Sequence, residues 1–173
     1  TSIDTLADQG AGCWLPDCRR GNGVNQYDHF TATVRNAMSQ PDIDGDGKPE
    51  RLIPSGIIWM QGESDALVEY SAMTYKDNLE TLTGEIRKTL GSVNIPVVIG
   101  RISDSGNDTD STVWTYGSIV RDAQAGFVKE DANAALVTKT DDYQYSDPWH
   151  YDSKGFIDLG IAFADALVAL RKP

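Results

Sequence analysis

Residues 56–65 read Gly-Ile-Ile-Trp-Met-Gln-Gly-Glu-Ser-Asp, an apolar run that gives way to polar residues. Five successive apolar positions of this kind are typical of a short strand that is buried on both faces. An amphipathic pattern with helical spacing follows, from Val68 to Leu90, and Gly91 ends it. We therefore expect a buried strand that ends at Gln61 and leads into a helix.

The same alternation of strand and helix continues through the chain. Further strands are predicted at residues 95–102 and 134–138, and further helices at residues 25–39, at 113–129 and after Ser153 as N-cap. Alternation of this kind predicts an α/β fold, a three-layer α/β/α sandwich with a parallel sheet of the flavodoxin-like type.

We expect residues 1–173 to form a single domain, because the chain contains no repeat, linker or low-complexity run. Three clear strands are few for a sheet of this architecture. A doubly wound sheet also begins with a strand, whereas this sequence begins with Thr-Ser-Ile-Asp. We therefore expect an N-terminal strand upstream of residue 1.

Charge and cysteine usage restrict the class of partner. The net charge is -11, which opposes binding to nucleic acid phosphates and to anionic membrane surfaces. No apolar run approaches the roughly 20 residues of a membrane span. Cys13 and Cys18 lie in one Gly- and Pro-containing loop. A disulfide between them is the favoured interpretation over half of a metal site, and it indicates a secreted or extracellular protein.

In parallel α/β sheets, ligands bind beyond the carboxyl ends of the strands. That rule selects residues 61–65, 103–108 and 141–150. The last of these segments contains Asp147 and His150. An aspartate three residues before a histidine can hydrogen-bond the imidazole and leave its other nitrogen free to act as a base. His29, the other histidine, lies within an amphipathic helix pattern and is expected to be a structural or surface residue.

Gln61 stands at the predicted end of the buried strand, where its amide could stabilise the oxyanion of an acyl-transfer intermediate. The alternative is a polar loop in which Ser64 or Asp65 caps the following helix.

Taken together, these segments resemble the SGNH-hydrolase superfamily. Residues 57–66 look like the Trp-x-Gln-Gly-Glu-x-Asp block of the sialate O-acetylesterase-like group and of carbohydrate esterase family six, which includes acetylxylan esterases. Residues 147–160 resemble the closing Asp-x-x-His block of those proteins, and residues 95–104 resemble the strand between the two blocks. The resemblance covers nearly the whole chain.

The resemblance implies an SGNH fold and a carbohydrate O-acetylesterase that acts through a Ser-His-Asp triad. Asp147 and His150 would be the acid and the base, and Gln61 would donate to the oxyanion. We assign substrate binding to Glu63 and Trp149, which lie beside these residues. The implied substrate is an acetylated carbohydrate, and the reaction needs no cofactor.

The sequence departs from the family pattern at the nucleophile. No Gly-Gln-Ser-Asn block is found, and Thr1-Ser2-Ile3 resembles the stretch after the family's second block. We expect the nucleophilic serine upstream of residue 1 or on a second polypeptide. Two alternatives stay open. One is an α/β-hydrolase that uses Ser64, and the other is a catalytically inactive glycan-binding module stabilised by calcium.

Calcium is expected because of the loop of residues 42–50, which reads Asp-Ile-Asp-Gly-Asp-Gly-Lys-Pro-Glu. Alternating carboxylates around a glycine turn suit a hard cation, and Ca²⁺ is its natural occupant. Ile53 stands where an EF-hand has its glutamate, so the loop is not an EF-hand. A solvated turn is the alternative. The expected ligands of a structural Ca²⁺ are Asp42, Asp44, Asp46, the backbone carbonyl of Lys48, and Glu50.

Overall fold

A parallel sheet forms the centre of the protein. The computed structural model describes residues 1–18 and 24–171. Within them, β1 (Ile57–Trp59), β2 (Val97–Gly100) and β3 (Ala134–Val137) pair in the order β1-β2-β3. Both pairings are parallel, with Ile58 opposite Val98 and Val98 opposite Ala135. The predicted α/β class with a parallel sheet is confirmed.

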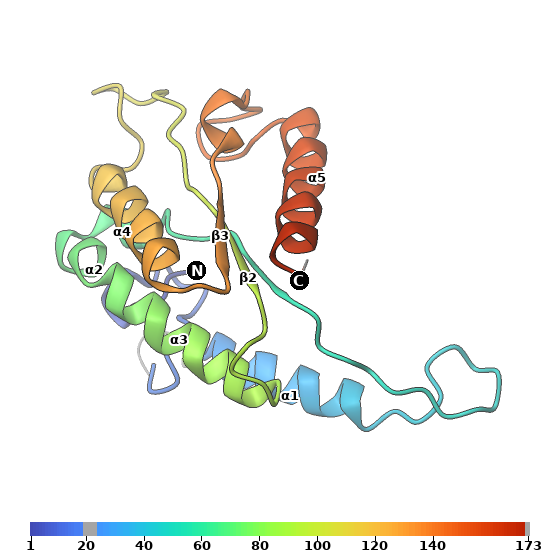
Figure 1. The fold of residues 1–173 in the computed structure, drawn as a ribbon. Helices are drawn as coiled ribbons and strands as arrows, with labels where there is room; N and C mark the ends of the chain where they lie inside the picture. Colours follow the sequence, from blue (N-terminus) through green and yellow to red (C-terminus); the bar gives the residue numbers. More distant parts are fainter. Residues whose placement is uncertain (19–23, 172–173) are drawn as a thin grey trace.

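Helices cover both faces of this sheet (Figure 1). On one face lies α5 (Ser153–Leu170), and on the other lie α3 (Tyr75–Thr89) and α4 (Gly117–Glu130). A methyl group added at Gly100 would come within 2.9 Å of Phe163, so β2 and α5 approach closely. This arrangement is the predicted three-layer sandwich. A further helix, α1 (Gln26–Met38), lies beside α3.

Alternation along the strands divides the core into two parts. Val97 and Ile99 point into the layer that contains α3 and α4, where they pack with Tyr75, Leu79, Leu82 and Phe127 among others. Val98 points to the opposite face and packs with Leu159 and Phe163 of α5. Burial on both faces explains why β2 is a continuous apolar run without polar alternation. The burial on both faces predicted for β1 was wrong, because Ile58 is 53% exposed.

The helix predicted from Val68 to Leu90 is two helices, α2 (Glu69–Met73) and α3. Thr74 separates them, with φ −95° and ψ 1°, and its hydroxyl donates to the carbonyl of Tyr70. Immediately after the break, the buried Tyr75 side chain donates to the carbonyl of Gln61 at 2.7 Å. The apolar stripe predicted the buried face correctly but did not reveal the break.

Two predicted helix starts were also wrong. The helix expected from residue 113 begins at Gly117, because the Asp104 carboxylate accepts hydrogen bonds from the backbone of Val113 and Trp114. The cap of α5 is Asp152, which accepts from the Gly155 N–H at 2.7 Å, whereas Ser153 is the first helical residue.

Short 3₁₀ helices and one disulfide complete the description. The 3₁₀ helices are η1 (Thr5–Ala7), η2 (Asp65–Leu67) and η3 (Lys139–Asp142). Cys13 and Cys18 form the predicted disulfide, with 5.9 Å between their Cα atoms. Among the helices of residues 1–18 and 24–171, none has the length and apolar character that a bilayer span requires.

Candidate active site

Asp147 and His150 form a close pair on the loop before α5. The Asp147 Oδ2 lies 2.7 Å from the His150 Nδ1, and the Asp147 Oδ1 lies 3.0 Å from the same nitrogen. Asp147 Oδ1 also accepts the backbone N–H groups of Trp149 and His150, each at 2.8 Å. Its hydrogen bond with His150 lowers the pKa of Asp147, so the carboxylate is ionised at neutral pH. An ionised acid on Nδ1 fixes the imidazole tautomer that presents Nε2 as a base.

The pair sits on a loop that closes on itself. Tyr145 and Tyr151 form an isolated antiparallel bridge, and the Ser146 N–H donates to the His150 carbonyl at 2.9 Å. Ser103, which follows β2, is buried and anchors this loop. Its hydroxyl oxygen lies 2.6 Å from that of Tyr145 and 2.8 Å from that of Tyr151. The carboxyl ends of β2 and β3 are thereby tied together.

Asp141 lies in η3, just before this loop, and two arginines hold its side chain. It forms ion pairs with Arg101, at the end of β2, and with Arg121 of α4, the latter at 2.7 Å. The guanidinium of Arg121 also donates to the carbonyl of Ile102 at 2.6 Å. Hydrogen bonding to Arg121, together with the charges of both arginines, lowers the pKa of Asp141. One carboxylate therefore connects β2, α4 and η3.

Gln61 lies at the end of β1, as predicted, and its side chain is held on several sides. The Gln61 Nε2 donates to Asp65 Oδ2 at 2.6 Å and to the carbonyl of Thr1 at 3.1 Å. The Tyr75 hydroxyl lies 3.4 Å from Gln61 Oε1. The next residue, Gly62, has φ 150°, and a Cβ there would lie 2.8 Å from Val120 of α4. A glycine is needed for this close approach.

Glu63 and Trp149, the predicted substrate-binding residues, lie on different loops. Glu63 is half-buried, and burial raises the pKa of its carboxyl group. Burial raises the pKa of Tyr145 and of Tyr151, and the negative charge of Glu63 raises both pKa values further. Glu63 therefore lies near the two tyrosines. Trp149 is 58% exposed beside the acid–base pair. Their role in substrate binding stays a prediction.

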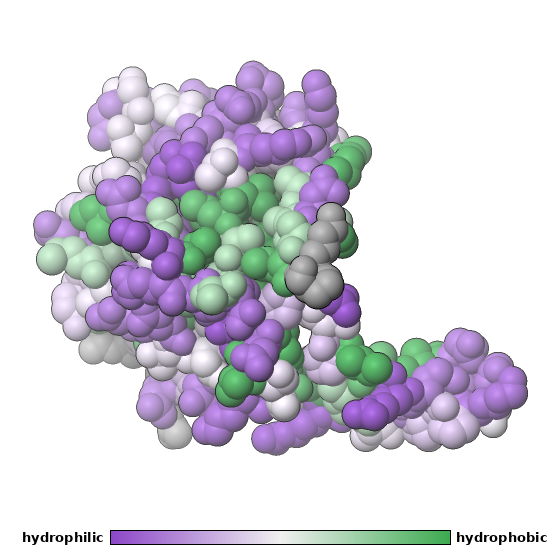
Figure 2. All heavy atoms as spheres, in the orientation of Figure 1, coloured by the Kyte–Doolittle hydropathy of each residue, from purple (hydrophilic) through white to green (hydrophobic). Residues whose placement is uncertain are grey.

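A polar cavity of about 510 Å³ lies beside Asp147. Hydroxyl, amide and carboxylate groups from the loops after β2 and β3 line it, among them those of Asn107, Tyr143, Gln144 and Ser146. The rim of the molecule that carries these loops is largely hydrophilic in the space-filling view (Figure 2). Such a lining suits a neutral, hydroxyl-rich ligand better than an apolar one.

Ser64 and Ser2 are poorly placed to act as nucleophiles. Ser64 has φ −66° and ψ −39°, an ordinary helical conformation, whereas a nucleophile elbow is a strained turn. Ser2 is fully buried, and its hydroxyl donates to the carbonyl of Asp4 at 2.7 Å. Within residues 1–18 and 24–171, no group hydrogen-bonds the His150 Nε2. That nitrogen is therefore available to a serine from outside these residues.

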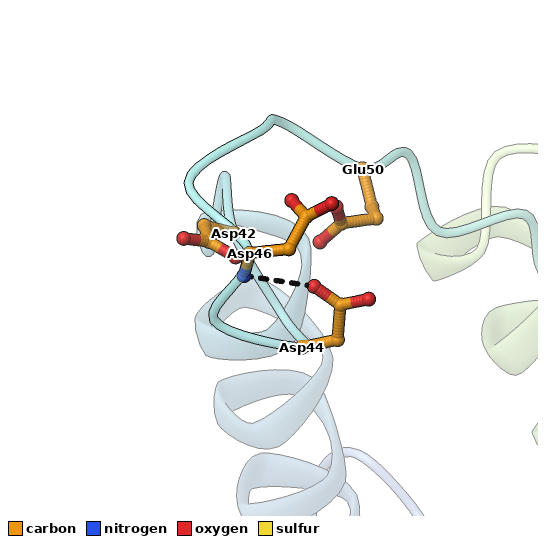
Figure 3. A group of neighbouring side chains, drawn as sticks. All are labelled: Asp42, Asp44, Asp46 and Glu50. Carbon is orange, nitrogen blue, oxygen red and sulfur yellow. Dashed lines mark hydrogen bonds between the residues drawn. The ribbon is translucent and has the colours of Figure 1, made fainter.

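Figure 3 shows the four acidic side chains of the 42–50 loop turned toward one another. One carboxylate oxygen from each of Asp42, Asp44, Asp46 and Glu50 lies within 4.8 Å of the others. The ammonium group of Lys48 binds Asp46 at 2.9 Å, where it competes with a cation. The loop projects from the end of the molecule opposite the Asp147–His150 loop (Figure 1), which agrees with a structural role.

Sequence reasoning missed Asp65 and the cluster of Ser103, Tyr145 and Tyr151. Their contacts join segments that are distant along the chain, so neither spacing nor periodicity indicates them. The signal that could have selected Asp65 is its place in the Trp-x-Gln-Gly-Glu-x-Asp block, four residues after Gln61. Ser103 lies at the end of a predicted strand, in one of the segments where ligands were expected.

Comparison with known proteins decides the family. The family model described as carbohydrate esterase, sialic acid-specific acetylesterase matches residues 10–169. The chain belongs to this family. The family membership confirms the resemblance seen in the two sequence blocks.

Known proteins are similar to parts of this chain. A probable carbohydrate esterase of Arabidopsis thaliana is 27% identical over 113 residues, which are 65% of this chain and 40% of the relative. A crystal structure of an Arabidopsis thaliana protein superposes with a TM-score of 0.62 and 22% identity over 86% of this chain and 54% of that one. A carbohydrate acetylesterase from Xanthomonas citri gives a TM-score of 0.50 and 20% identity over 66% of this chain and 26% of its own. The chain thus spans about half of these proteins or less.

Proposed function

We propose that this protein is a serine-type carbohydrate O-acetylesterase in which residues 1–173 supply the acid, the base and one oxyanion donor. The observation that carries the proposal is the Asp147–His150 pair, with 2.7 Å between Oδ2 and Nδ1, in a chain of the carbohydrate esterase family. The substrate is an acetylated, neutral carbohydrate, for which the polar cavity beside Asp147 offers hydroxyl and amide partners.

The reaction follows the logic of a Ser-His-Asp triad. The His150 Nε2 takes the proton of a serine hydroxyl as its oxygen attacks the acetyl carbonyl carbon. Gln61 donates to the oxyanion that forms, and Asp147 stabilises the imidazolium. Collapse of the intermediate breaks the ester bond, and the imidazolium returns its proton to the departing sugar oxygen, which leaves as a hydroxyl group. Water then attacks the acetyl-serine by the same route and releases acetate.

The nucleophilic serine is proposed to arrive at the free edge of β1. In the described part of the chain β1 pairs with β2 alone, and Ile58 is 53% exposed. An apolar groove of about 430 Å³ follows this strand and is lined by Trp14, Phe30 and Trp59 among others. A parallel strand added here would end beside Gln61 and Thr1, on the side of the sheet where His150 lies.

Hydrogen exchange tests this placement. The Ile57 N–H donates to the Pro96 carbonyl of the neighbouring segment, so the Ile58 N–H, one residue later, faces the free edge. It should exchange within seconds in the 173-residue chain and be protected at least tenfold in the full natural protein. Equal exchange in both would contradict an added strand.

The alternative is a serine on a separate polypeptide. The comparisons support a carbohydrate substrate but give no support to a second polypeptide. Intact-mass analysis of material from the natural source separates the two cases. A longer chain that contains residues 1–173 places the serine on the same polypeptide, whereas a second, co-purifying chain places it in trans.

Two further properties are proposed with the enzyme. A structural Ca²⁺ would be bound by Asp42, Asp44, Asp46 and Glu50, with the Lys48 carbonyl as an additional ligand, and would order the projecting loop. The Cys13–Cys18 disulfide supports a secreted or extracellular location, because such bonds persist in oxidising compartments.

The experiment that tests the function is acetate release from acetylated xylo-oligosaccharides and from O-acetylated sialic acid by the full natural protein. We expect turnover of the neutral substrate, and little of the anionic one, because residues 1–173 carry a net charge of -11. Glycan binding without any acetate release would instead support the calcium-stabilised binding module.

A further inference from the structure

Asp65 is a fully buried carboxylate at the junction of two segments that are far apart in sequence. It begins η2, and its exposed fraction is 0%. Asp65 Oδ2 accepts the N–H of Ile3 at 2.9 Å, and Asp65 Oδ1 accepts the N–H of Asp4 at 3.0 Å. The Gln61 amide donates to the same carboxylate at 2.6 Å. Buried carboxylates are costly unless hydrogen-bonded in this way.

Three N–H donors on two oxygens favour the ionised form of Asp65, since a protonated carboxyl would turn a hydroxyl toward a donor. Burial raises the pKa of Asp65, and these hydrogen bonds oppose that effect. The ionised carboxylate can only accept hydrogen bonds. It therefore forces the NH₂ end of the Gln61 side chain to face it.

The Tyr75 hydroxyl lies beside the other end of the same amide, 3.4 Å from Gln61 Oε1, and donates its hydrogen to the backbone carbonyl of Gln61 at 2.7 Å. With one Nε2 hydrogen held inside by Asp65, the second is donated to the carbonyl of Thr1 at 3.1 Å. Thr1 is exposed, and a reacting carbonyl oxygen that displaces the Thr1 carbonyl would accept this second hydrogen.

We propose that Asp65 is a positioning residue for the acyl-transfer site. Its carboxylate holds the Gln61 amide in the orientation that directs one hydrogen toward a reacting carbonyl oxygen. It also fastens the backbone of Ile3 and Asp4 to the same loop, so that residues 1–4 form one wall beside the amide. This inference rests on the proposed esterase function.

The first test needs no substitution. In the nuclear magnetic resonance spectrum of the 173-residue chain, one side-chain amide hydrogen of Gln61 should be shifted downfield and exchange slowly with water. Gln40 is exposed and provides the internal reference. Gln61 amide hydrogens that resonate and exchange like those of Gln40 would overturn the proposal, whether or not any variant folds.

The second test separates positioning from stability in the full natural protein. Removal of one oxyanion donor costs about 10²–10³ in kcat, and we expect Asp65→Asn to lower kcat by about 10² with KM changed less than about twofold. Asp131→Asn is the matched control, because it removes a partly buried carboxylate that binds Arg87 away from the site. That variant should keep its kcat.

A double-mutant cycle shows whether Asp65 acts through Gln61. In a Gln61→Ala background, Asp65→Asn should lower kcat by less than about threefold. A loss as large as in the unmodified background would overturn the positioning role, because the effect would then be independent of Gln61. The proposed function fails separately: an unmodified protein without esterase activity contradicts it, whereas an active protein indifferent to Asp65→Asn contradicts only the inference about Asp65.

Discussion

At the scale of residues, the proposed chemistry depends most directly on the hydrogen bond from His150 to Asp147. Replacement of Asp147 by asparagine exchanges the ionised carboxylate for a neutral amide that no longer fixes the imidazole tautomer. We expect kcat of the full natural protein to fall by about 10⁴, as it does in Ser-His-Asp enzymes. Circular dichroism and the melting temperature should change little, because the Asp147 side chain is 41% exposed.

His29→Ala is the matched control for this prediction. His29 is the other histidine of the chain and is exposed on α1. Its loss should leave kcat unchanged. Equal activity of Asp147→Asn and the unmodified protein would remove Asp147 from the mechanism.

The Asp141 carboxylate predicts a dependence of stability on pH. Its pKa is lowered in the folded protein, chiefly by the hydrogen bond with Arg121. A lowered folded-state pKa means that the stabilisation is fully present above the unfolded pKa of aspartate, about 3.9, and is lost as the pH falls through the folded value. The melting temperature of the unmodified protein should therefore fall more steeply below about pH 4 than that of Asp141→Asn. Parallel curves would contradict this assignment.

Residue spacing predicted the local part of the site well. Asp147 and His150 are three residues apart on one loop, so their contact follows from the chain itself. The contacts of Asp65 with Ile3 and Asp4 depend on the fold and could not be predicted from spacing. The same holds for Ser103, whose partners Tyr145 and Tyr151 arrive from the loop after β3.

At the scale of elements, apolar runs predicted all three described strands to within two residues at each end. Helix starts were harder, because side chains from other segments decide them. The Asp104 carboxylate accepts hydrogen bonds from the N–H groups of Val113 and Trp114, and the helix begins only after these residues. Thr74 interrupts a stripe whose apolar positions continue on both sides of it. Hydrophobic periodicity reports which face is buried, whereas local hydrogen bonds determine where a helix begins.

The loop of residues 42–50 carries the metal prediction. Titration calorimetry should show one Ca²⁺ per chain with a Kd on the order of 10⁻⁵–10⁻³ M, and Asp44→Asn should weaken binding at least tenfold. Chelation of the metal should leave kcat unchanged, because the loop projects from the end opposite the acid–base loop (Figure 1). No measurable heat with Ca²⁺ would identify the loop as a solvated turn.

At the scale of the whole molecule, the sheet brings the ends of β1, β2 and β3 to one side. Gln61 follows β1, Ser103 follows β2, and the Asp147–His150 loop follows β3. The rule that ligands bind beyond the carboxyl ends of parallel strands selected these same segments before any family was considered. The proposed enzyme has two further elements, the nucleophile and a strand that would pair with β1, which we place outside the described residues.

The measurement that tests the central claim most directly is covalent labelling of the full natural protein with a fluorophosphonate, followed by peptide mass spectrometry. The account predicts a single labelled serine outside residues 1–173, and labelling at least 10³-fold slower in His150→Ala. A label on Ser64, or labelling at an unchanged rate without His150, would contradict it.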